Sequence, residues 1–138
     1  MTTFSPIPAY VLGTLILALG TNAIGRPGPE YPRFGLPFEH AATVPTHANH
    51  SPPPGAVSPL MYLKGIRETS YGLALIALQY QGQDTALTTF AAILALTAFA
   101  DGLLVWRHGG DTLKMKAFGH WLTFVGLAGW SWWRSSYA

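Results

Sequence analysis

Four apolar segments constrain this chain more than any other feature. Each has a length close to the roughly 20 residues that an α-helix needs to cross a bilayer. They cover residues 7–24, 60–80, 86–106 and 117–133 of the 138. Charged side chains make up only 10% of the sequence and hydrophobic ones 49%, whereas about 25% of an average soluble domain is charged. The sequence therefore predicts an all-α integral membrane four-helix bundle in a single domain.

The connections between the segments differ greatly in length. Residues 25–59 form a long, proline-rich loop. Since proline removes a backbone donor and disrupts helices and inner strands, we expect this loop to be irregular, lying over the mouth of the bundle or loose in water. The QGQD and HGGD turns are short, which predicts that the last three helices are sequential antiparallel neighbours.

Basic residues predict the orientation of the bundle. The side of the long loop carries seven of them, and the opposite side carries Arg134 alone. Basic residues prefer the cytosolic side of a membrane. We therefore expect an integral protein of the endoplasmic reticulum membrane, with lumenal termini and a cytosolic long loop. The seven residues are Arg26, Arg33, Lys64, Arg67, Arg107, Lys114 and Lys116.

Composition also narrows the classes of partner. The net charge of +2 is too small, and the basic residues too scattered, to predict nucleic acid binding. Cysteine is absent, and His40, His47 and His50 lack a metal-binding spacing. We expect no metal and no organic cofactor, a lipid bilayer and a lipophilic small molecule as partners, and homo-oligomers as an open alternative. The glycines predict close helix approach rather than phosphate binding; they are Gly13, Gly20, Gly65, Gly72, Gly119, Gly126 and Gly129.

Polar side chains lie at one common depth inside three of the segments. At about 1.5 Å of rise per residue, Arg67, Glu68, Asp101 and His120 all lie roughly 9 to 10 Å from the loop-side ends of their helices. Asn22 lies nearer the end of the first helix. Residues three and four apart share a helix face, so each of the last three helices has one polar face. These faces contain Lys64, Arg67, Glu68 and Tyr71; Thr97, Asp101 and His108; and Lys116, His120 and Thr123.

The three polar faces predict a cavity that opens toward the long loop and has an apolar floor. An ionised side chain at a helix centre costs about 2.5 to 3.5 kcal/mol, so we expect Arg67 to pair with Asp101. Glu68 would then be left over, and a carboxyl group in an apolar pocket can hold a proton and act as a general acid. Alternatively, Glu68 pairs with Lys64. We expect the long side chain of Lys64 to extend to the membrane–water interface. For His120, the alternative to a catalytic role is a structural hydrogen bond to a backbone carbonyl.

The motifs KGIRETSYGLALIAL and ADGLLVWRHGG, followed by a Lys and a His that lead the last segment, carry a family resemblance. The chain resembles a small four-span membrane family, common in fungi, that is known as a domain of unknown function. Some of its members are regarded as hydrolases or cyclases of epoxidised polyketides. The resemblance covers about the whole chain and implies Arg67 and Asp101 as site residues, followed by Glu68 and His120.

Together these observations predict a membrane enzyme that opens an epoxide on a lipophilic, polyketide-like substrate. The attacking oxygen would belong to water, as in an epoxide hydrolase, or to an internal hydroxyl of the substrate, as in an epoxide-opening cyclase. Opening an oxirane requires an acid at its oxygen and a base at the attacking oxygen. We expect Asp101 to be the base, kept ionised by Arg67, and Glu68 to be the acid. Direct attack by water and a covalent ester through Asp101 both stay open. The expected positioning and substrate contacts are His120, Tyr71, Asn22, Thr97 and Tyr62.

Two alternatives remain. The same acid and base could serve an isomerase, or a terpene-type cyclase of a polyene or prenylated intermediate. From a different class, the chain could be a non-catalytic membrane scaffold, in which Arg67 and Asp101 only clasp two helices.

Overall fold

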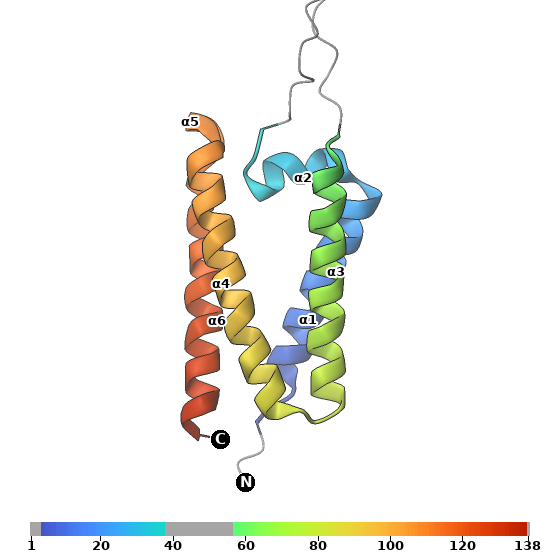
Figure 1. Ribbon diagram of the computed structural model, residues 1–138, viewed down its shortest axis with the longest axis vertical. Coiled ribbons are helices and arrows are strands. Elements are labelled where there is room, and N and C mark those ends of the chain that lie inside the picture. Colours follow the sequence, from blue (N-terminus) through green and yellow to red (C-terminus); the bar gives the residue numbers. More distant parts are fainter. Residues whose placement is uncertain (1–3, 38–56, 138) are drawn as a thin grey trace, which may run out of the picture.

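Four long helices form the body of the computed structural model, which describes residues 4–37 and 57–137. They are α1 (Ile7–Gly25), α3 (Pro59–Tyr80), α4 (Asp84–His108) and α6 (Ala117–Tyr137). Each coincides within a few residues with one of the apolar segments, and all regular secondary structure in the described ranges is helical. The all-α prediction is therefore confirmed. Both ends of the chain lie at the same end of the bundle (Figure 1).

A short helix, α2 (Pro27–Phe34), occupies part of the connection that the sequence predicted to be irregular. For this stretch the prediction was wrong. Pro27 and Pro29 lie in the first turn, where backbone N–H groups have no partner within the helix, so the missing donors cost little. The helix ends at Gly35, whose φ of 107° lies in the left-handed region that glycine adopts without strain. The short elements α5 (Gly110–Leu113) and η1 (Lys114–Lys116) join α4 to α6.

Glycines bring the backbones of α1 and α3 into contact. A Cβ atom on Gly72 of α3 would lie 2.6 Å from the carbonyl oxygen of Gly13, and one on Gly65 would lie 3.0 Å from that of Gly20. Close helix approach is thus confirmed for these four glycines. It is not confirmed for the glycines of α6, because added Cβ atoms there meet nothing within 4 Å. The α1–α3 pair forms one half of the bundle.

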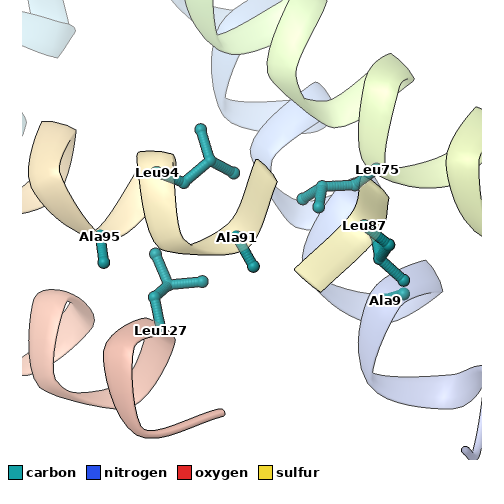
Figure 2. Packing of buried hydrophobic residues seen from close by; sticks show 7 residues of the cluster. All are labelled: Ala9, Leu75, Leu87, Ala91, Leu94, Ala95 and Leu127. Atoms are coloured by element: carbon teal, nitrogen blue, oxygen red, sulfur yellow. The ribbon is translucent and has the colours of Figure 1, made fainter. Parts of the chain in front are cut away.

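The second half is the α4–α6 pair, and the two halves meet mainly at the end where the termini lie (Figure 1). A buried apolar cluster joins them there, with Leu75 of α3, Leu87, Ala91 and Leu94 of α4, and Leu127 of α6 (Figure 2). Toward the other end the halves diverge, and α2 lies across that end. This divergence leaves room for the cavity described below.

Two helices of the described ranges, α1 and α4, are long and apolar enough to cross a membrane. The apolar windows of α1 and α4 are only 22% and 28% buried inside the protein. The other two long helices are more polar: α3 carries Lys64, Arg67 and Glu68, and α6 is rich in glycine and serine and contains His120.

Candidate functional site

A cavity of about 450 Å³ lies between the two helix pairs. Side chains from α1, α2, α3, α4, η1 and α6 line it. The leucine and isoleucine side chains of the lining form its apolar part; they are Ile16, Leu19, Leu94 and Leu127. The polar lining consists of Arg33, Arg67, Glu68, Tyr71, Thr97, Asp101, Lys116, His120 and Thr123. The polar faces that the sequence predicted on α3, α4 and the start of α6 therefore meet in one cavity.

The ion pair between Arg67 and Asp101 joins α3 to α4 at the wall of this cavity. The Nη2 atom of Arg67 donates to both carboxylate oxygens of Asp101, at 3.2 and 2.9 Å. A single guanidinium nitrogen makes both contacts, so the pair is not a two-nitrogen fork. The Nε atom of Arg67 is buried and has no hydrogen-bond partner among the described residues. The predicted pair is present, and Arg67 keeps donors that it does not use on Asp101.

Glu68 is not left over, as the leading sequence interpretation required. Its carboxylate lies 2.8 Å from Nζ of Lys64, one turn earlier on α3. Lys64 also lies 3.7 Å from Oε2 of Glu30 in α2, and its side chain is only 11% exposed. Lys64 therefore does not extend to an interface. It is held inside because two carboxylates from different helices share its charge.

Glu30 is the residue that fixes α2 against the rest of the bundle. It is buried, and its Oε1 accepts hydrogen bonds from Nδ2 of Asn22 in α1 and, at 2.7 Å, from Nη1 of Arg33. With Lys64 on its other oxygen, this carboxylate joins α1, α2 and α3. A buried charge is stable only when it is paired and hydrogen-bonded, and Glu30 meets that condition.

His120 joins α6 to α2. One ring nitrogen, Nε2, lies 2.9 Å from the carbonyl oxygen of Phe34. Because a carbonyl oxygen can only accept, Nε2 donates and carries the proton. The Phe34 ring also packs edge-on against the imidazole, with 4.8 Å between centroids. His120 thus makes the structural hydrogen bond to a backbone carbonyl that was the alternative to a catalytic role. Its ring also lines the cavity.

The remaining predicted site residues divide into two groups. Tyr71 and Thr97 line the cavity. Asn22 and Tyr62 are not among its lining residues: Asn22 is bound to Glu30, and Tyr62 is exposed on the outer side of α3. The structure thus separates these two from the site. His40, His47 and His50 lie outside the described residues.

Arg33 lines the cavity and was missed by the sequence interpretation. It was counted only as a basic residue of the long loop, because a segment with so many prolines carried no helical signal. The i, i+3 spacing of Glu30 and Arg33 was the only local hint that a helix orients them. Across residues 4–37 and 57–137, no three His, Cys, Asp or Glu side chains gather closely enough to hold a metal ion.

These features define a class of protein: a helical chain with two helices that could cross a membrane and an ion-paired polar cavity between two helix pairs. Residues 13–134 match the family described as a domain of unknown function, DUF4267, and the chain belongs to this family. No curated protein and no solved structure matches the chain.

Proposed function

We propose that this chain is a membrane enzyme that opens an epoxide on a lipophilic substrate. The observation that carries the proposal is the Arg67–Asp101 ion pair on the wall of a cavity of about 450 Å³, beside Glu68, Tyr71 and His120. A concave site with an apolar part and a few convergent polar groups is the usual form of a small-molecule site. The family resemblance supports the same reaction.

The outer surface of the bundle supports a membrane location with four spans. Large apolar side chains point outward from all four long helices, for instance Leu15, Leu63, Leu96 and Leu122, which are 58%, 58%, 65% and 74% exposed. Contiguous apolar surface of this kind marks contact with a membrane or another protein. Contact with lipid on all sides would also explain why the ionisable groups lie on the inner faces.

Asp101 is the proposed base. Its two oxygens accept from a single nitrogen of Arg67, so lone pairs remain for a water molecule in the cavity. Arg67 holds the carboxylate in position through these two contacts. Water attacks one oxirane carbon as the C–O bond breaks, and Asp101 takes the proton from the attacking oxygen.

The choice of the proposed acid depends on the contact between Lys64 and Glu68. Because the Glu68 carboxylate is paired with Nζ of Lys64, the hydroxyl of Tyr71, one turn further along α3, is the better first donor to the oxirane oxygen. The Lys64–Glu68 pair then supplies the proton that the alkoxide finally takes. Asp101 then releases its proton to water, and the Lys64–Glu68 pair takes a proton back from water. All groups return to their starting state, and the net reaction adds one water molecule to the epoxide.

The test is hydrolysis of 1,2-epoxydodecane to its diol by the full chain in membranes, followed by mass spectrometry. Asp101→Asn should lower kcat/KM by about 100-fold or more, the usual contribution of a general base. Tyr71→Phe should lower it further than Glu68→Gln does. A matched control is Asp111→Asn, which removes an exposed carboxylate that, within the described part of the chain, is ion-paired with Lys114; this change should have little effect.

Full activity in Asp101→Asn would rule out the proposed base. If Glu68→Gln loses more activity than Tyr71→Phe, Glu68 is the first acid after all. A single turnover in heavy-oxygen water separates the two routes of attack. Label in the diol indicates direct attack by water, whereas label in Asp101 indicates an ester.

A scaffold is the rival function that a specific observation favours. The helix pairs touch little away from the terminal end, and Arg67–Asp101 is an ion pair that joins α3 to α4 across that gap. As a clasp, it would need no substrate. Variants that fold normally but have lost turnover would exclude this alternative, whereas a wild-type chain that turns over no epoxide would favour it.

A further inference from the structure

A second, smaller cavity of about 340 Å³ is lined by residues of α2, α3 and α4. Its wall is largely apolar, with Phe34, Leu36, Met61, Leu63 and Leu104 among the lining side chains. The volume is within the range of about 300 to 1,000 Å³ that is typical of small-molecule sites. No residue of α6 is among its lining residues.

The two cavities share one part of their walls. Arg67 and Asp101 line both of them. On one side of the pair lie Glu68, Tyr71 and His120, and on the other side lies the apolar wall of the smaller cavity. The ion pair is therefore the boundary between the larger cavity, which holds most of the polar groups, and a smaller, mainly apolar cavity whose lining also includes Lys64 and Tyr31.

Arg67 has unused hydrogen-bonding capacity at this boundary. Both of its bonds to Asp101 come from Nη2, and its buried Nε lacks a partner in the described part of the chain. A buried donor is rarely left unpaired in a native protein. The Arg67 side chain as a whole is 35% exposed, so an oxygen atom of a ligand at the boundary could accept from the exposed part of the guanidinium.

We infer that the substrate lies across this boundary, with its oxygen-bearing reactive group in the larger cavity and an apolar chain or ring system in the smaller one. The inference rests on the proposed function and specifies its substrate class. That class is an amphiphile whose epoxide adjoins an unsubstituted hydrocarbon part large enough to fill a second compartment. A small, water-soluble epoxide would occupy the larger cavity alone.

The smaller cavity also has a route to the outside of the bundle. Leu63 and Leu104 line it and are 58% and 47% exposed. In a bilayer, the side of the cavity formed by these exposed side chains would face lipid. A substrate dissolved in the membrane could then enter sideways, hydrocarbon part included, without crossing water.

The first arm of the test narrows the smaller cavity and compares two substrates. Leu104→Trp should lower kcat/KM for 1,2-epoxydodecane by about tenfold or more, the scale on which pocket contacts discriminate between substrates. It should leave the value for 1,2-epoxybutane within about twofold. Leu103→Trp is the control, since Leu103 is exposed to a similar extent and lines neither cavity.

A second pair of variants guards against misfolding of the first. Leu63→Trp on α3 should repeat the loss for the long substrate, and Ile66→Trp, which is equally outward-facing but lines neither cavity, should not. Equal losses for both substrates, or equal losses in the control variants, would overturn the inference.

The second arm does not depend on turnover. A twelve-carbon 1,2-diol with a diazirine at the far end of its chain is photolysed with the full chain in nanodiscs, and the adducts are mapped by mass spectrometry. Adducts within residues 60–64 or at residue 104 are expected, at least about tenfold weaker in Leu104→Trp. Adducts elsewhere, or equal labelling by a diazirine-bearing phosphatidylcholine, would overturn the inference, since the latter assigns the cavity to bilayer lipid.

The two arms also separate this inference from the proposed reaction. Labelling of the smaller cavity without turnover of any epoxide contradicts the proposed reaction and supports the two-compartment site. Turnover of 1,2-epoxydodecane that is insensitive to Leu104→Trp, without labelling at the expected residues, contradicts the two-compartment site and leaves the reaction standing.

Discussion

Arg67 and Asp101 differ in how well they could tolerate the loss of their partner. The side chain of Arg67 is 35% exposed and that of Asp101 only 14%. Without Asp101, the long arginine side chain could still extend toward water in either cavity. Without Arg67, the short carboxylate of Asp101 would stay in place with little solvation.

This difference predicts an asymmetry in stability. Arg67→Met should destabilise the protein by about 1 to 3 kcal/mol, because it leaves a largely buried acceptor charge unpaired. Asp101→Leu should cost less, and the double variant should recover part of the loss of Arg67→Met, as expected for directly coupled residues. Chemical unfolding in detergent, followed by far-ultraviolet circular dichroism, measures all three. Additive single effects would show that the pair does not couple the two helices.

At the residue scale, sequence reasoning predicted those ion pairs whose partners lie on one helix or at the same depth on neighbouring helices. The price of unpaired charges in an apolar segment predicted the Arg67–Asp101 pair, and the i, i+4 spacing offered the Lys64–Glu68 pair as an alternative. The choice between a free and a paired Glu68 depended on Glu30, which holds Lys64 in the interior. Glu30 comes from another element, so no spacing within α3 could reveal it.

At the scale of the elements, the contact between α1 and α3 depends on the absence of side chains at four positions. Gly72 packs against the backbone of α1 so closely that a methyl group would lie 2.6 Å from the Gly13 carbonyl oxygen. Backbone atoms cannot move aside as a flexible side chain can. Gly126 of α6, by contrast, has open space at the same position.

Alanine substitutions at these two glycines should therefore have opposite effects. Gly72→Ala should destabilise the protein by about 1 to 3 kcal/mol, the usual cost of overpacking. Gly126→Ala should be neutral or stabilising by up to about 1 kcal/mol, because alanine is the better helix former. Thermal unfolding in the same detergent compares the two variants. Similar stability of both would show that α1 and α3 can separate at no cost.

The four long helices were predictable because a run of apolar residues about 20 long has few other ways to satisfy its backbone polar groups. The short helix α2 was not, because prolines oppose a helix on average. Pro27 and Pro29 are tolerated in its first turn, but Pro32 lies inside the helix, where proline is unfavourable. As a result the sequence placed Arg33 in a loop, although α2 directs it toward the cavity.

At the scale of the whole molecule, large apolar side chains are exposed on all four long helices. Both ends of the chain lie at the same end of the bundle (Figure 1). If all four long helices span a bilayer, the two termini must be on the same side. The helices α3 and α6 would then be held in lipid by their packing against α1 and α4, since α3 and α6 are less apolar themselves.

This arrangement predicts how the whole chain behaves in cells. Extraction with alkaline carbonate should leave it in the membrane fraction, and epitope tags at the two termini should both be accessible, or both protected, in sealed vesicles. The positive-inside rule predicts that both are protected in microsomes. Release by carbonate would contradict the four-span bundle, and tags on opposite sides would contradict an even number of spans.

The sequence by itself determined the helical class, the positions of the four long helices, and the shared depth of Arg67, Glu68, Asp101 and His120, because length, hydropathy and helical rise are local properties. Only the tertiary structure decided which polar groups are partners. Pairing into α1–α3 and α4–α6 depends on where two backbones can touch, and the gap between the pairs depends on where they diverge. Glu30 on Lys64, the Phe34 carbonyl on His120, and the placing of Arg67 and Asp101 between two cavities all join elements far apart in the chain. No local pattern encodes such contacts, since they exist only once the helices have packed.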